Sequence, residues 1–119
     1  MNRSRFQCRT ALLAALSIAG VQQLACQEAV RHTYIYKTIG DLRLRADVYR
    51  TPDNIVRPAL LWIHGGALIM GNRQGLDHVQ ADKYLSAGYT IIAVDYRLTP
   101  QAKLPQIIED LEDAYRWVR

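Results

Sequence analysis

The chain has 119 residues, of which 50% are hydrophobic and 22% are charged, and its formal net charge is +4. This length suits one small domain, and the composition is that of a globular protein rather than a disordered or repetitive one. Three of the 15 basic residues are Arg3, Arg5 and Arg9, near the N-terminus. The rest of the chain has 12 basic and 11 acidic residues. So balanced a charge does not indicate a nucleic-acid-binding surface.

The N-terminal segment has the three-part layout of a secretory signal peptide. Arginines precede an apolar run over residues 11–21, and small residues surround the end of that run. We therefore expect residues 1–26 to be a signal peptide and residues 27–119 to form the folded part, in the periplasm or outside the cell. The alternative is an uncleaved membrane anchor, although the run is shorter than the ~20 residues of a membrane-spanning helix.

The two cysteines, Cys8 and Cys26, both lie in this segment. Cleavage would leave at most Cys26, so no internal disulfide framework is expected. Residues 23–26 resemble a bacterial lipobox whose leucine stands one position too close to the cysteine. We expect contact with a membrane only if Cys26 is lipidated or the segment stays uncleaved.

The first part of the folded region has the pattern of a β-hairpin. Residues 32–39 are rich in β-branched and aromatic side chains, and residues 42–49 alternate between apolar and polar. Gly40 and Asp41 separate the two runs. The pattern predicts two antiparallel strands, the second with one face on a core and Asp47 among the residues on the face in water.

Residues 59–63 are five consecutive apolar residues that end at His64, Gly65 and Gly66. This predicts a strand buried on both faces of a parallel sheet and directed at a glycine loop. Ligands of open α/β sheets bind beyond the carboxyl ends of the strands, where free N–H groups can stabilise a developing negative charge. The loop is therefore a candidate oxyanion hole. A tight turn that needs only positive φ angles is the simpler alternative.

A helix and a second buried strand follow the loop. Asp77 can cap a helix that runs to about Ala87, and residues 90–94 are again wholly apolar. Strand, helix and strand form a βαβ unit with a right-handed crossover, in which both strands end on the same side. We therefore expect residues 95–97 to lie close to the glycine loop.

The last predicted element is a helix that begins near Pro105. An apolar stripe at helical spacing supports it, and acidic residues precede the arginines at its end, as the helix dipole favours. The stripe consists of Ile107, Ile108, Leu111, Ala114, Tyr115 and Val118.

Three motifs occur in one order: WIHGGA at residues 62–67, VDYRLTP at residues 94–100 and PQIIED at residues 105–110. Together they resemble the N-terminal part of an α/β-hydrolase, similar to serine esterases of the hormone-sensitive-lipase-like and feruloyl-esterase-like groups. The resemblance covers essentially all of residues 27–119. It implies the N-terminal portion of an α/β-hydrolase sheet: an antiparallel hairpin, then a βαβ unit and a helix. We expect this sheet to be truncated before the strand that leads to the nucleophile.

The resemblance implies that the N–H groups of Gly66 and Ala67 form the oxyanion hole, with Gly65 giving the loop its turn. Ala67 replaces the glycine that is commoner at this position, and donation still comes from its amide. His64 is expected to stabilise the loop rather than act as a base.

The remaining expectations concern the residues near this loop. Asp95, Tyr96 and Arg97 are expected to tie loops together, with Arg97 paired to Glu109 or Asp110. A substrate contact by Tyr96 is the alternative. We expect no metal or redox cofactor, because the three histidines and Cys26 lack ligand spacing.

The serine nucleophile of this fold lies in Gly-x-Ser-x-Gly, and the acid and the histidine follow it. The chain has only Ser4, Ser17 and Ser86, and none has glycine at both second neighbours. We expect hydrolysis of small-molecule esters by an intact serine carboxylesterase of which this chain is a truncated record. A non-catalytic fragment or split half-domain, and a peptidase of the same fold, remain alternatives.

Overall fold

The computed structural model describes residues 28–119, so the predicted signal segment and both cysteines lie outside the described part. Four strands, two α-helices and one 3-10 helix follow one another along these residues. They are β1 (Val30–Ile39), β2 (Leu42–Arg50), β3 (Ala59–Ile63), η1 (Arg73–Gly75), α1 (His78–Ser86), β4 (Thr90–Val94) and α2 (Leu104–Val118). The predicted hairpin, βαβ unit and final helix are all present.

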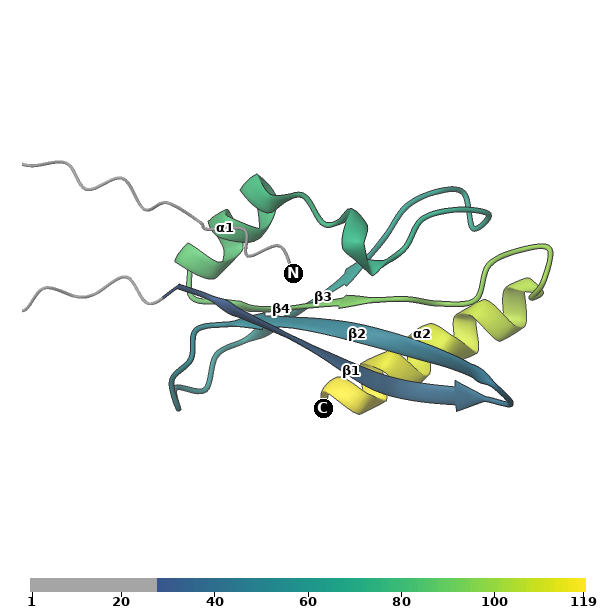
Figure 1. Cartoon of the computed structure of the whole chain (residues 1–119), viewed down its shortest axis with the longest axis horizontal. Helices are drawn as coiled ribbons and strands as arrows, with labels where there is room; N and C mark the ends of the chain where they lie inside the picture. Colours follow the sequence, from purple (N-terminus) through teal and green to yellow (C-terminus); the bar gives the residue numbers. More distant parts are fainter. Residues whose placement is uncertain (1–27) are drawn as a thin grey trace, which may run out of the picture.

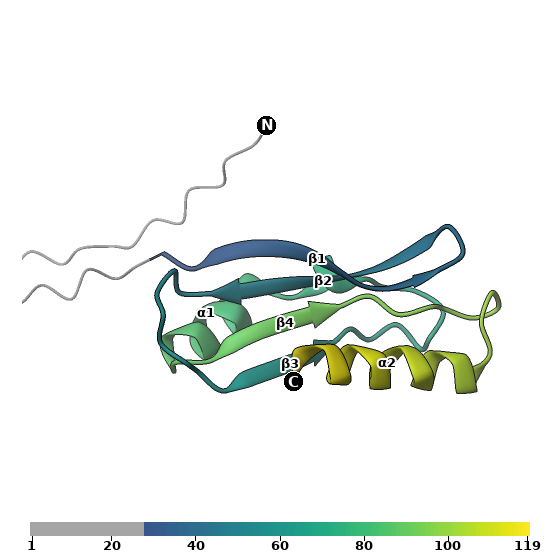
Figure 2. The same ribbon diagram turned by 90° about the horizontal axis from the view of Figure 1, so that it is seen from below.

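The four strands form one sheet in the order β1-β2-β4-β3 (Figures 1 and 2). β1 and β2 pair antiparallel, with an irregularity between Ile35 and Lys37, and β2 pairs antiparallel with β4. β3 and β4 run parallel in register from Ala59 opposite Thr90 to Ile63 opposite Val94. The two strands of the βαβ unit therefore end on the same side, as predicted.

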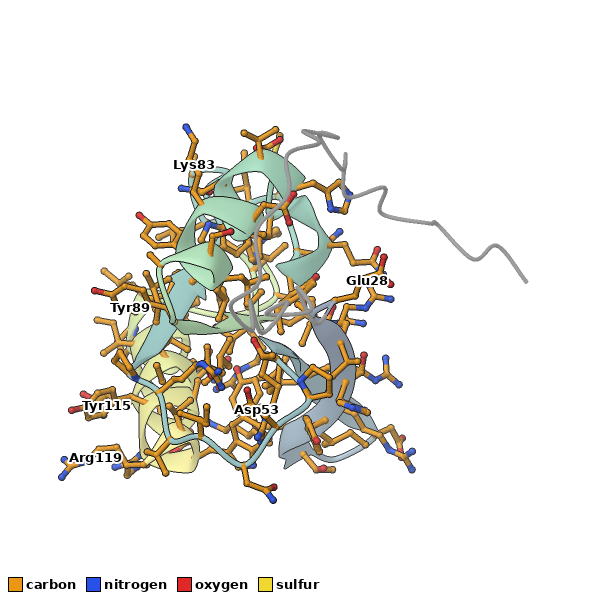
Figure 3. The ribbon with its side chains drawn as sticks, turned by 90° about the vertical axis from the view of Figure 1, so that its left-hand side faces the viewer. Glu28, Asp53, Lys83, Tyr89, Tyr115 and Arg119 are labelled. Atoms are coloured by element: carbon orange, nitrogen blue, oxygen red, sulfur yellow. The ribbon has the colours of Figure 1, made fainter. Side chains whose placement is uncertain are left out.

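Each face of the sheet carries one α-helix. Figure 3 views the sheet from one side, with α1 on one face and α2 on the other. The period of two along the strands separates the side chains into these two cores. The core under α2 contains Ala46, Ile92, Val94 and Ala114, and the core under α1 contains Leu76, Ala81, Ile91 and Ala93.

The prediction for residues 59–63 was wrong in one respect, because β3 is not buried on both faces. Ile63 is 46% exposed and no residue of β3 is fully buried. The reason is position, since β3 is the edge of the described sheet and pairs only with β4. The fully buried strand is β4, in which Ile91, Ala93 and Val94 are all inaccessible to solvent.

The two helices begin as their sequences predict. The side chain of Asp77 accepts a hydrogen bond from the backbone N–H of Gln80, which is an N-cap for α1. In α2 the predicted stripe is only partly buried, because Ile108 and Tyr115 are about half exposed while Ile107 and Ala114 are buried. No helix within residues 28–119 is long and apolar enough to cross a membrane.

The exposed edge of β3 generates a prediction about solubility. Residues 27–119 expressed alone should aggregate or stay molten, because an apolar strand with unpaired backbone groups templates association. Ile63→Lys should raise the soluble fraction severalfold in ultracentrifugation, since an edge lysine opposes strand addition. Val79→Lys, at a 63% exposed position on α1, is the matched control and should change little. A sharp, cooperative melt from a monomer of the unsubstituted segment would contradict this prediction.

Candidate active site

The glycine loop begins where β3 ends, and one carbonyl group organises it. The carbonyl oxygen of Gly66 accepts hydrogen bonds from the N–H groups of Ile69, at 3.0 Å, and Met70, at 3.1 Å. Three consecutive residues have positive φ angles, +117° at Gly66, +53° at Ala67 and +65° at Leu68. The loop therefore turns tightly back on itself directly after the strand.

Two glycines are required by this turn. A Cβ atom at Gly66 would lie 2.1 Å from the carbonyl oxygen of Met70, and one at Gly71 would lie 2.4 Å from His64 Nδ1. Both distances are far below van der Waals contact. A Cβ atom at Gly65 would meet nothing within 4 Å. The close approach of backbone to backbone thus explains Gly66 and Gly71, whereas Gly65 has free space.

His64 is part of the packing of the loop. Its side chain is 5% exposed, its Nδ1 lies 2.8 Å from the carbonyl oxygen of Gly65, and its ring stacks on that of Tyr96 at a centroid distance of 4.2 Å. The Tyr96 hydroxyl donates a 2.8 Å hydrogen bond to the carbonyl oxygen of His64. Burial raises the pKa of Tyr96, so the hydroxyl stays a donor at neutral pH. This places residues 95–97 beside the glycine loop, as predicted.

A partly buried ion-pair cluster holds the far end of the loop. Arg73 donates its backbone N–H to Asp95 Oδ1 at 2.9 Å, and its guanidinium lies 2.6 Å from Asp95 Oδ2 and 3.0 Å from Asp47 Oδ1. Thr33 also donates to Asp47 Oδ1 at 2.6 Å. Burial disfavours the charge of Arg73, but its two carboxylate partners outweigh burial and raise its pKa.

Sequence reasoning missed this cluster. The alternation in β2 predicts a water-facing side chain for Asp47, yet Asp47 is 1% exposed. The correction follows from η1, which covers that face and brings Arg73 onto the carboxylate. The one signal in the sequence was an aspartate in the alternating run, whose charge has no basic partner opposite it in the hairpin, where Thr33 stands.

Arg97 pairs with Asp110, the second of the two predicted partners. Arg97 Nε lies 2.8 Å from Asp110 Oδ2, Nη2 lies 2.8 Å from Oδ1, and the Arg97 N–H donates to Oδ2 at 3.1 Å. Lys37 Nζ approaches the same carboxylate at 2.8 Å and Asp113 at 2.6 Å. Glu109 is more distant from Arg97, at 3.6 Å, and its side chain is 59% exposed.

The charge state of Asp110 follows from these contacts. Its side chain is fully buried, and burial alone would raise the pKa of its carboxyl group. Hydrogen bonds from Arg97 and Lys37 outweigh burial and hold the pKa of Asp110 below its usual value. Asp110 is therefore an ionised acceptor that ties α2 to β1 and to the segment after β4.

The segment after Arg97 also contacts the loop. Thr99 donates its backbone N–H to the carbonyl oxygen of Leu68 at 2.8 Å, and its hydroxyl lies 3.3 Å from the same oxygen. Leu68 packs on a small core of Tyr96, Ala102 and Ile107. Within residues 28–119, the hydrogen bonds of the loop include none donated by the N–H groups of Gly66 and Ala67.

The described residues hold no serine near this loop. Ser86 is the one serine among residues 28–119, and it is the exposed last residue of α1. Nor do these residues contain a group of three His, Cys, Asp or Glu side chains placed to hold a metal ion. What the described part offers is a shaped loop with backbone donors.

Residues 46–119 match the model of the BD-FAE family. The chain belongs to the BD-FAE family. The matched region includes the glycine loop, β4 and α2, which are the parts that carry the three sequence motifs. This BD-FAE chain has the fold of the N-terminal part of an α/β-hydrolase, as the resemblance predicted.

Several curated relatives are similar to parts of the chain. An ethyl acetate hydrolase of Pseudomonas putida is 36% identical over 74 residues, which are 60% of this chain and 23% of that protein. Esterase LipI of Mycobacterium tuberculosis is 37% identical over 67 residues, 56% of this chain and 21% of that protein. A non-reducing polyketide synthase of Penicillium brevicompactum is 37% identical over 92 residues, which are 73% of this chain but only 4% of the synthase.

Solved structures support the fold. A Thermogutta terrifontis esterase aligns with 74% of this chain, and the aligned part is 33% of the esterase chain. The TM-score is 0.64 and the sequence identity is 23%. An Enterococcus faecalis α/β-hydrolase superfamily protein matches 75% of this chain and 31% of its own, with a TM-score of 0.62 and 24% identity. The BD-FAE chain thus spans about a third of these solved proteins.

The loop geometry generates a matched pair of substitutions. Gly66→Ala should open the loop, because its Cβ would collide with the Met70 carbonyl at a φ angle that alanine rarely adopts. Gly65→Ala should be tolerated. If the strain is ~1–3 kcal/mol, trypsin should cleave after Arg73 about 5- to 100-fold faster in Gly66→Ala. Equal cleavage rates in the two variants would contradict the role of Gly66.

The Asp110 cluster generates a prediction of pH dependence. Asp110→Asn leaves Lys37 and Arg97 short of a buried partner and should lower the free energy of unfolding by about 3–5 kcal/mol. Glu109→Gln is the exposed control and should cost less than about 1 kcal/mol.

The sign of the pH effect follows from the lowered pKa of Asp110. The stabilisation by its carboxylate is complete above pH ~4, the ordinary carboxyl value, and is lost as the pH falls through the lowered pKa. The measurement is thermal unfolding of both proteins, expressed in the source organism, over a range of pH. The difference in unfolding free energy between Asp110→Asn and the unsubstituted protein should shrink only at acid pH. A difference that stays constant down to acid pH would refute the assignment.

Proposed function

We propose that this chain supplies the oxyanion-binding part of a serine hydrolase that acts on small-molecule carboxylic esters. The observation that carries the proposal is the loop after β3, in which the Gly66 and Ala67 amides lack an acceptor among the described residues. Relatives named as an ethyl acetate hydrolase and an esterase support the class of reaction.

The proposed chemistry is acyl transfer. A serine oxygen attacks the carbonyl carbon of the ester, and the π electrons of the carbonyl bond move to its oxygen. The N–H groups of Gly66 and Ala67 donate to that oxyanion as its charge develops. Collapse of the tetrahedral intermediate re-forms the carbonyl group, leaves the acyl group on the serine oxygen and expels the alcohol, which takes the proton that a base removed from the serine. Water then attacks the acyl-serine in the same way, releases the acid and returns a proton to the serine oxygen.

The chain's own residues have a preorganising role in this proposal. Donors stabilise an oxyanion best when they are fixed before the reaction, because no reorganisation then accompanies it. Tyr96 fixes the first residue of the loop through the His64 carbonyl, and Thr99 fixes Leu68. Arg73 fixes the far end through Asp95. The loop is thus held at both ends and in the middle.

The nucleophile, base and acid would come from outside these residues, because the sequence contains no Gly-x-Ser-x-Gly. That absence also favours the second candidate, a half-domain that is inert without a complementing polypeptide. A peptidase of the same fold is less well supported, since the hydrolase relatives are named as ester hydrolases. We also propose export, on the basis of the signal-like residues 1–26, with lipidation of Cys26 as a variant of it.

The decisive variant removes one donor without changing a side chain. Replacing Ala67 by lactic acid turns its amide N–H into an ester oxygen, and kcat for 4-nitrophenyl acetate should fall about 10²- to 10³-fold. The same replacement at Ala87 is the control, because that N–H donates to the Lys83 carbonyl at the end of α1, outside the loop. Unchanged kcat at Ala67, in a preparation that hydrolyses esters, would exclude this amide from the oxyanion hole.

A further inference from the structure

Asp47 is a buried charge that the proposed chemistry does not use. Its Oδ1 atom accepts a 2.6 Å hydrogen bond from the Thr33 hydroxyl and lies 3.0 Å from Arg73 Nε. Its Oδ2 atom is buried and has no hydrogen-bond partner among residues 28–119. Burying a charge is costly unless an opposite charge compensates for it. Within this part of the chain Arg73 is the one cation that forms an ion pair with Asp47, so the two side chains depend on each other.

The sheet places Asp47 beside Asp95. Asp47 lies opposite Ala93 in the pairing of β2 with β4, and Asp95 comes two residues after Ala93. Because side chains alternate between the faces of a strand, the two carboxylates lie on one face of the sheet, which η1 covers (Figure 1). Arg73 reaches both, since its Nη1 lies 2.6 Å from Asp95 Oδ2. Its guanidinium is therefore held between β2 and the segment that follows β4.

The position of Arg73 affects how the glycine loop closes. Gly71 comes two residues earlier and lies against the start of the loop, where an added Cβ atom would be 2.4 Å from His64 Nδ1 and 2.5 Å from the Gly65 carbonyl oxygen. A carbonyl oxygen can only accept, so His64 Nδ1 donates the 2.8 Å hydrogen bond to Gly65. The Gly65 carbonyl and the Gly66 N–H belong to one planar peptide group. Contacts that fix this carbonyl therefore also fix the direction of the N–H.

We infer that Asp47 is a positioning residue of the proposed oxyanion hole and acts through Arg73. Asp47, fixed by Thr33, holds the Arg73 side chain. Arg73 in turn keeps Gly71 against the start of the loop, which fixes the peptide group that carries the Gly66 N–H. The inference rests on the proposed function for the reaction that this amide serves. It gives a role to a hairpin that contributes no residue to the loop itself.

The test compares Asp47→Asn with Val48→Ala in the protein expressed in its source organism from the chromosomal gene. Asparagine keeps the shape of the side chain and an oxygen for the Thr33 hydroxyl, but it removes the charge that attracts Arg73. Val48 is the next residue of β2, and its side chain packs on the core under α2. Its truncation weakens the same strand and leaves the contact with Arg73 in place.

Hydrolysis of 4-nitrophenyl acetate separates positioning from stability. In Asp47→Asn kcat should fall about 10- to 100-fold, because small displacements of catalytic groups have effects of this size. KM should stay within about twofold, since an oxyanion donor acts in the transition state. Val48→Ala should leave both constants unchanged. An unchanged kcat in Asp47→Asn would overturn the inference, and so would an equal fall of kcat in Val48→Ala.

A second pair of variants keeps the inference testable if Asp47→Asn does not fold. Thr33 is exposed, so its substitution is tolerated more easily. Thr33→Val removes the hydroxyl that fixes Asp47 Oδ1 and should lower kcat about 3- to 10-fold, the usual effect of one hydrogen bond. Thr33→Ser keeps the hydroxyl and should have the kcat of the unsubstituted protein. Equal kcat values in the two Thr33 variants would overturn the inference.

Hydrogen exchange tests the coupling without relying on hydrolysis. The N–H groups of Ile69 and Met70 are hydrogen-bonded within the loop, so their exchange with solvent measures its opening. This exchange should be at least about tenfold faster in Asp47→Asn than in Val48→Ala. Equal exchange in the two variants would overturn the inference even if esters are hydrolysed. Faster exchange in an unsubstituted background that hydrolyses no ester would support the coupling and count against the proposed function.

Discussion

The candidate site depends on three consecutive residues that follow β4. Because β4 is buried on both faces, it holds the three residues that follow it in a fixed position relative to the sheet. Asp95 binds Arg73 at the far end of the glycine loop, Tyr96 binds His64 at its beginning, and Arg97 binds Asp110 in α2. A single strand end thus fixes two ends of one loop and the helix that packs beneath the sheet.

The contacts differ in chemistry, and this affects what each can do. The hydrogen bond from the Tyr96 hydroxyl to the His64 carbonyl oxygen joins two uncharged groups, and the raised pKa of Tyr96 keeps its donor protonated at neutral pH. Asp110 forms a bidentate pair with the Arg97 guanidinium, which adds geometric specificity to its energy. Asp95 instead accepts one bond from the Arg73 guanidinium and one from the Arg73 backbone N–H. The Tyr36 hydroxyl also donates to the Asp95 carbonyl oxygen at 2.5 Å, which joins β1 to the same point. Burial and nearby carboxylates raise the pKa of Tyr36, so this donor also stays protonated.

Sequence patterns predicted the fold well because they act locally. Alternation over residues 42–49 and the short apolar run at residues 90–94 predict strands from neighbouring residues alone. The exposure of β3 and the burial of Asp47 could not be predicted from local patterns. The first depends on which strands pair with β3, and the second depends on η1 covering that face of β2. The pairing of Arg97 with Asp110 was among the predictions because a charge beyond a buried strand needs a partner. Arg73 was missed because nothing in a loop sequence shows where its guanidinium will lie.

The central claim is that these residues form the oxyanion-binding part of a serine hydrolase. It is tested most directly by native mass spectrometry of the protein from its source, with and without a fluorophosphonate that labels activated serines. The account predicts a species or complex well above 13.6 kDa, the mass of the 119 residues, that gains one label. A species at or below that mass that gains no label would contradict it.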